Sequence, residues 1–487
     1  MSSKVEPFSA EPQENEEIKI DHSKKGLIIL FVSVLLILIV IGLIVYLVLS
    51  TGSDSEKDNK QDDGGESKIS NYILAKYDIY DTEKETKLFF RTYVDLIESM
   101  KIDDQEEAIK NYTKLFNNKG VHTLQIIFKN KLTSLEKLFY YTESLIEVDL
   151  SNLYMTEVEK LSEMFEGCSS LTKINFANFN STKVYNISNM YKGCSKLNEI
   201  NLDIFKNNKL IDIEGLFSGC SSLTKLNLNN LDTTNVINMS NLFYGCNSLQ
   251  SLEINNLKTE KVVDMSSMFY GCSSLSSLDL NHFITSKTIH MSGMFESCSK
   301  LNSLSFKFDT SNVEDMYLMF RDCVSLTSLD IGSFTTDKVT DMFGMFKNTG
   351  IQSIDLSKFE TKSVIDMGDM FGNCTSLKQI NLDNFNTENL IYINGMFEGC
   401  TNLESLNISN FNTKKIEDAR HLLNGCSNLK NIDFSNFDSS NIKYYEGIFD
   451  NLPEGGIFKY NSKIFNLTNL LPKNWSLTDT NNANNAI

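Results

Sequence analysis

Hydrophobic positions along most of the chain recur with a period close to 26 residues. One unit, MSSMFYGCSSLSSLDLNHFITSKTIH, runs from Met265 to His290. Its opening M-x-x-M-F has the i, i+3, i+4 spacing that predicts one face of a short helical turn. The later L-x-x-L-x-L-x-x-F, Leu275–Phe283, has the spacing of a leucine-rich-repeat strand. One such unit is too small to bury its own apolar face, so the units must stack.

A single cysteine in each unit marks the repeat along the chain. Successive cysteines are separated by 26, 26, 26, 26, 26, 25, 51, 26 and 26 residues. The step of 51 contains a unit in which Thr349 takes the cysteine position, and Thr142 and Leu452 take it at the two ends. The repeat therefore predicts a solenoid of about a dozen rungs over residues 133–452.

One position of each unit, between the last two core leucines, is expected to point outward from the strand. These residues should form a polar stripe along one face of the sheet, with neighbours ~5 Å apart. The stripe is a candidate recognition surface for a protein or glycan, although a merely solvated face has the same composition. The predicted partner-binding residues are Glu253, Asp279, Ser305, Asp330, Asp355 and Asn381.

Residues 26–49 form an apolar run of 24 residues without a charge. That length spans ~30 Å of hydrocarbon as a helix, which predicts a single transmembrane segment. A cleavable signal peptide is the main alternative, but its apolar core is shorter, ~7–15 residues. Lys24 and Lys25 flank only one end, so the N-terminus should be cytosolic and the repeats extracellular.

The remaining segments complete the predicted organisation. Residues 1–25 are expected to be a disordered cytosolic tail, and residues 50–70 a flexible acidic stalk. Alternating apolar positions indicate a β-rich N-terminal cap over 71–132, and 453–487 should form a C-terminal cap and frayed tail. The expected fold class is thus an α/β repeat solenoid of leucine-rich-repeat type. Each 26-residue rung would contribute one short strand and one short helical turn.

Charge and composition exclude several functions. The chain has 63 Asp and Glu against 45 Lys and Arg, a net charge of −18, which argues against a nucleic-acid partner. Its five histidines lie far apart, and no metal-ligand spacing or phosphate-binding loop occurs. Because no nucleophile–base pair is evident either, the sequence predicts neither an enzyme nor a bound cofactor.

The cysteine column has two interpretations, a disulfide ladder in an oxidising compartment or buried free thiols. Thr349 separates seven cysteines from three, so pairing between adjacent rungs leaves one thiol over in each group. A bridge across Thr349 would span two rungs, ~10 Å, beyond the reach of a disulfide. Buried free thiols are therefore expected.

The string MSSMFYGCSSLSSLDL, repeated with small changes, resembles the BspA-type leucine-rich-repeat surface proteins of bacteria and protozoa. It is most similar to the 25–26-residue variant of mycoplasma surface proteins. The resemblance implies a surface-exposed solenoid, with adhesion proposed for some members, and it carries no catalytic motif. Bacterial members often have other anchors, so the N-terminal apolar segment is a departure.

Two functional hypotheses follow from these features. The first is a membrane-anchored cell-surface protein that binds an extracellular protein or glycan through the polar stripe. The second is a structural surface-coat protein that acts as a rigid rod without a specific ligand. The two differ in whether the sheet face binds anything saturably.

Overall fold

The computed structural model of the chain describes residues 71–109, 111–206, 209–464 and 467–480. The predicted cytosolic tail, transmembrane segment 26–49 and stalk lie outside these residues. Within the described ranges, no helix combines the length and the apolar character needed to cross a membrane.

The N-terminal part of the described chain is a six-stranded sheet in the order β4-β3-β6-β1-β7-β8. Strand β1 pairs antiparallel with both β6 and β7, and β7 is the strand of the first rung. The first rung therefore has no open edge, because β1 occupies it. The strands are β1 (Tyr72–Ile79), β2 (Glu85–Lys87), β3 (Ile97–Ile102), β4 (Gln105–Glu106), β5 (Thr113–Leu115), β6 (Gly120–Phe128), β7 (Leu145–Asp149) and β8 (Lys173–Asn175), with the 3-10 helix η1 at Arg91–Leu96.

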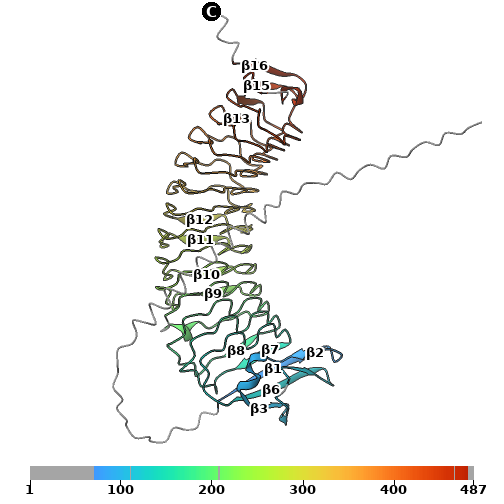
Figure 1. Ribbon diagram of the computed structural model, residues 1–487, viewed down its shortest axis with the longest axis vertical. Helices are drawn as coiled ribbons and strands as arrows, with labels where there is room; N and C mark the ends of the chain where they lie inside the picture. The colour runs from blue at the N-terminus through green and yellow to red at the C-terminus, as the bar shows by residue number, and fades with distance from the viewer. Residues whose placement is uncertain (1–70, 110, 207–208, 465–466, 481–487) are drawn as a thin grey trace, which may run out of the picture. The chain divides into compact units, whose positions relative to one another are not determined.

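From β7 onward the chain forms a solenoid whose rungs follow one another in sequence order (Figure 1). Where strands form, those of neighbouring rungs pair in parallel and in register, as Asp279 does with Ser305; the pairs are β7-β8, β9-β10, β11-β12 and the series β13 to β16. On the opposite edge, a row of parallel bridges runs through the described chain from Ser134 to Tyr444. The elements are β9 (Lys225–Asn227), β10 (Ser251–Glu253), β11 (Ser277–Leu280), β12 (Ser303–Phe306), β13 (Ser405–Asn407), β14 (Asn431–Phe434), β15 (Gly456–Tyr460), β16 (Trp475–Asp479), η2 (Asp203–Phe205) and η3 (Leu467–Leu470).

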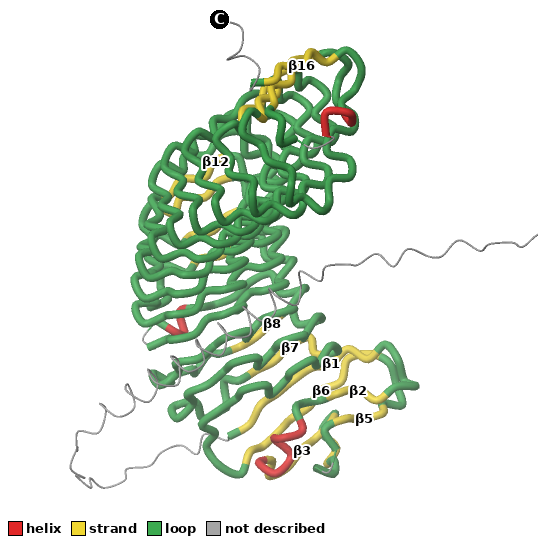
Figure 2. Tube along the Cα trace, turned by 45° about the horizontal axis from the view of Figure 1, so that its top comes forward, coloured by secondary structure: helices red, strands yellow, loops and turns green. Residues whose placement is uncertain are grey.

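The predicted helical turn in each rung is wrong, and the rungs are β-solenoid turns instead (Figure 2). Ser267 and Gly271 have positive φ values of 53° and 68°, which a right-handed helix cannot contain. The amides alternate: those of Ser267, Phe269 and Gly271 donate to carbonyls of the next rung. The amides between them donate three residues back within the rung. The i, i+3, i+4 spacing therefore buries the expected side chains without forming a helix.

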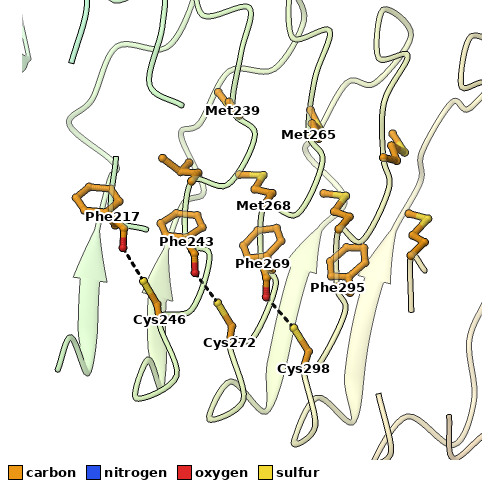
Figure 3. Packing of buried hydrophobic residues seen from close by; sticks show 14 of the residues in the cluster. Phe217, Met239, Phe243, Cys246, Met265, Met268, Phe269, Cys272, Phe295 and Cys298 are labelled. Carbon is orange, nitrogen blue, oxygen red and sulfur yellow. Dashed lines mark hydrogen bonds between the residues drawn. The ribbon is translucent and has the colours of Figure 1, made fainter. Parts of the chain in front are cut away.

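The core consists of columns of similar side chains, one from each rung (Figure 3). The aromatic column is stacked nearly face to face. Phe269 lies 5.4 Å from Phe243 and 5.7 Å from Phe295 between ring centroids. Met265 and Met268 fill the space beside it and are fully buried. Every rung thus buries its apolar residues against the rungs before and after it.

A buried threonine column ties the outer turns of successive rungs together. The hydroxyl of Thr259 donates to the carbonyl of Ile284 at 3.0 Å and accepts the N–H of the same residue at 2.8 Å. The equivalent Thr310 makes the same two bonds to Thr335. Each of these threonines therefore closes the outer turn of the rung that follows it.

All ten cysteines are buried free thiols, as predicted. The thiol of Cys272 donates to the carbonyl of Phe243 on the preceding rung at 3.3 Å, and that of Cys298 donates to Phe269 at 3.1 Å (Figure 3). Burial raises the pKa of Cys246 to about 12, so the reactive thiolate is suppressed. Where the column is interrupted, Thr349 donates instead to the carbonyl of Phe346 within its own rung.

Native protein should therefore react slowly with a maleimide, and unfolded protein should label at all ten cysteines without prior reduction. Mass spectrometry before and after denaturation measures the number of labels. Labelling that required a reductant would contradict free thiols.

Candidate functional site

The six sequence-predicted partner-binding residues lie on consecutive rungs and all are exposed. Where the strands are regular, the register is direct: Asp279 stands opposite Ser305, and Glu253 opposite Asn227. We call the whole outward column the polar stripe. Its members are Asp149, Asn175, Asn201, Asn227, Glu253, Asp279, Ser305, Asp330, Asp355, Asn381, Asn407 and Asp433.

The carboxylates of the stripe also hold the backbone turns that follow the strands. Asp279, Asp330 and Asp355 each accept the N–H of the residue two positions on, at 2.9–3.0 Å. Asp279 also accepts the Ser305 hydroxyl at 3.1 Å. The backbone N–H bonds lower the pKa of both Asp279 and Asp355, so these groups stay ionised. The stripe therefore presents ionised carboxylates whose orientation is fixed by hydrogen bonds.

The stripe continues beyond the residues selected from the sequence. Lys459 of β15 stands opposite Asp433, and its Nζ lies 3.4 Å from that carboxylate. Lys459 follows Asp433 by 26 residues and so keeps the period of the repeat, although the sequence predicted the last rung to end at residue 452.

A second polar column, on the bridged edge of the solenoid, was missed by the sequence reasoning. We call Asp315, Asp341 and Asp366 the carboxylate row; they occupy successive bridge positions. Burial raises the pKa of Asp341 to about 7 and that of Asp366 to about 6, with like charges from neighbouring carboxylates adding to the effect. The signal that marks this column is an Asp-Met pair that begins four of the units, at Asp264, Asp315, Asp341 and Asp366.

The repeat histidines His282 and His290 do not combine with the acids into a site, whereas His122 Nδ1 of the N-terminal cap lies 2.6 Å from Asp103 Oδ2. His282 Nε2 lies 2.8 Å from the Ile254 carbonyl oxygen, while His290 takes a bridge position between Asp264 and Asp315. Across the part of the chain that the structure describes, no group of three or more His, Cys, Asp or Glu side chains is arranged to hold a metal ion.

A stack of leucine-rich-repeat-like rungs with buried Phe, Met and Cys columns defines the class of protein. The chain belongs to the family described as Mycoplasma protein of unknown function, DUF285. The family model matches residues 106–225, 133–252, 211–325, 276–380, 349–455 and 379–484. The predicted resemblance to the BspA-type repeat, in its mycoplasma variant, is confirmed.

Solved structures with some likeness include three bacterial proteins. A leucine-rich cell surface protein from Faecalibacterium prausnitzii is 18% identical, with 63% of this chain and 83% of that chain covered and a TM-score of 0.37. A leucine-rich repeat protein from Eubacterium ventriosum is 17% identical, with coverage of 58% and 81% and a TM-score of 0.25. The functional domain of InlJ from Listeria monocytogenes is 14% identical, with coverage of 69% and 71% and a TM-score of 0.20. No curated protein matches the chain.

Proposed function

We propose that the chain is a membrane-anchored surface protein that binds an extracellular protein or glycan through its polar stripe. The observation that carries the proposal is the row of exposed polar side chains on six consecutive rungs, with its carboxylates fixed by backbone bonds. A ligand spanning several rungs meets a surface whose groups are already oriented, so little ordering entropy is lost on binding.

The anchoring part of the proposal rests on the sequence. Residues 26–49 would cross the membrane, with Lys24 and Lys25 keeping the N-terminus in the cytosol. The repeats would then face the outside as a binding module and not as an enzyme.

The alternative is a structural coat protein. The continuous row of parallel bridges and the stacked aromatic column favour a rigid assembly of rungs, which a coat also needs. Saturable binding of a ligand to the sheet face is expected of the binding protein and not of the coat protein.

Removing three charges from the stripe should weaken binding by about tenfold or more, because charged hydrogen bonds contribute ~1.5–3 kcal/mol each. The variant carries three substitutions together, Asp279→Asn, Asp330→Asn and Asp355→Asn, and is called the triple Asn variant. Asparagine keeps the oxygen that accepts the turn N–H, as Asn407 does for Ser409 at 3.0 Å. The melting temperature should therefore change little. Binding of the full chain to an array of matrix proteins and glycans is the measurement.

The matched control removes the same number of charges from turn-holding aspartates outside the stripe. Asp232, Asp309 and Asp438 each accept the N–H two residues on, at 3.0–3.1 Å. Their triple Asn variant should bind as the unchanged chain does. Equal losses in both variants would place the ligand elsewhere, and the absence of any saturable ligand would favour the coat protein.

A further inference from the structure

The sheet face contains a hollow of about 500 Å³ over segment 198–203 and strands β9 and β10. Three members of the polar stripe, Asn201, Asn227 and Glu253, line it. A volume of this size falls in the ~300–1,000 Å³ range of small-ligand sites. The hollow is therefore a candidate subsite within the larger face.

Within the described chain, the hollow lies at a rung that is not paired into a sheet, as the rungs of Asp330, Asp355 and Asn381 also are not. The rungs on either side are paired, β7 with β8 and β9 with β10. Among the described residues, no backbone hydrogen bond joins segment 198–202 to the strand before or after it. Leu202 has φ −101° and ψ −6°, which ends the extended conformation, and η2 replaces the usual turn after it.

The break leaves peptide groups available to a ligand. Asn198, Glu199 and Asn201 are exposed, and among the described residues their N–H and C=O groups bond to no neighbouring rung, whereas those of strands β9 and β10 pair with each other. Unpaired donors and acceptors that alternate along an extended segment are suited to bind a ligand that carries both kinds of group.

The side chains lining the hollow are polar and mutually fixed. Asn227 Nδ2 donates to Glu253 at 2.6 Å, and Asn230 Nδ2 donates to Asp203 at 2.7 Å. These bonds orient amide and carboxylate groups before a ligand arrives, which reduces the entropy lost on binding.

The charge and composition of the lining limit the class of ligand that the hollow can bind. The lining carries three carboxylates, Glu199, Asp203 and Glu253, against the single cation Lys225, which disfavours an anion. No Trp, Tyr or Arg lines it, and those are the residues enriched in protein-binding hot spots. Paired amides and carboxylates instead match vicinal hydroxyls, which donate and accept together.

We propose that this hollow binds a short segment of uncharged oligosaccharide. The inference rests on the proposed function and assigns its glycan partner to one place on the sheet face. Recognition is by hydrogen bonds from Asn201, Asn227 and Glu253 and from the open backbone of segment 198–202.

The test uses the full chain in detergent micelles with four probes. These are maltotriose, cellotriose, triacetylchitotriose and, as the anionic probe, 3′-sialyllactose. Saturation-transfer NMR and calorimetry should show saturable binding of at least one neutral trisaccharide, and sialyllactose should bind about tenfold more weakly or not at all.

Asn227→Asp is the critical variant. It keeps the oxygen that accepts the N–H of Asn229 at 2.8 Å, but it replaces the amide donor facing Glu253 with a like charge. Trisaccharide binding should fall about tenfold or more. Asn386→Asp makes the same kind of change at an exposed turn outside both the hollow and the polar stripe, where Asn386 accepts the N–H of Glu388 at 3.1 Å, and should leave binding unchanged.

Each remaining outcome overturns the inference. Unchanged binding by Asn227→Asp, equal losses in both variants, preference for sialyllactose, or no trisaccharide binding at all would each do so. If no trisaccharide binds but a matrix protein still binds and is lost in the triple Asn variant, the proposed function stands without the sugar subsite. If neither class of ligand binds, both proposals fall.

Discussion

Replacing Phe269 with Ala should lower the free energy of unfolding by about 3–5 kcal/mol. The ring is fully buried and stacks on both neighbours, Phe243 at 5.4 Å and Phe295 at 5.7 Å. Truncation removes apolar contacts on two faces at once and leaves a cavity that the rigid backbone ladder on either side cannot close. Phe269→Leu, which keeps much of the volume, should cost less.

Hydrogen exchange is the sharper measurement, because each rung contacts only its neighbours. Amides of the rungs carrying Phe243 and Phe295 should lose protection, while those near Phe397 should keep it. Val324→Ala, at a side chain 46% exposed, is the control and should change stability by about 0.5 kcal/mol or less. If Phe269→Ala lowered the free energy of unfolding no more than Val324→Ala does, the aromatic column would not stabilise the fold.

Acidification from pH 8 to pH 5 should raise the melting temperature of the solenoid. The pKa of Asp341 is raised from 3.8 to about 7, and that of Asp366 to about 6, chiefly by burial. A carboxyl with a raised folded pKa binds its proton more tightly in the native state, so stability falls as pH rises from about 4 to about 7. The same holds for Glu214 and Glu296, whose pKa values burial raises to about 7.

Below about pH 4 the trend should reverse. The pKa of Asp279 and Asp355 is lowered by hydrogen bonds to their charged forms, and that stabilisation is lost as the pH falls through their folded pKa values. A stability maximum on the acidic side of neutral is therefore expected.

Asp341→Asn isolates the contribution of the carboxylate row. The amide oxygen can still accept the N–H of Phe343, which Asp341 accepts at 2.8 Å. Asn238 already fills an equivalent bridge position and accepts the N–H of Ser240 at 2.9 Å. The variant should melt at a higher temperature than the unchanged chain at pH 8 and show a flatter pH profile. An unaltered profile would mean that the row does not titrate in this range.

The columns of the core were predictable because every rung presents the same environment to its neighbours. The spacing of Cys272, Phe269 and Leu278 in one unit, repeated through the chain, determines which side chains face inward. The conformation of the turn was not predictable, because the i, i+3, i+4 spacing of apolar residues also suits a turn that is interrupted by left-handed residues. The clue lay in Gly215 and Gly293, which recur at the position of Ser267 and share its positive φ.

The site was predictable only as a column of outward positions. That the stripe aspartates also hold turns depends on backbone torsions, which the strand spacing does not encode. The hollow lies at a rung where Asp203–Phe205 is helical and Leu202 departs from the strand conformation. A repeat analysis averages over such a rung, so its local chemistry appears only when the backbone is seen.

The alternation of turn amides between their own rung and the next has an evolutionary consequence. Ser267, Phe269 and Gly271 bond to the following rung at the same positions as Asn241, Phe243 and Gly245 do one rung earlier, so the turn sides of these junctions are interchangeable. A gene can gain or lose one repeat in frame by unequal recombination, and the joined rungs still offer each other complete partners. Length is therefore a trait that selection can adjust in whole units, without redesigning the ends or re-optimising the core.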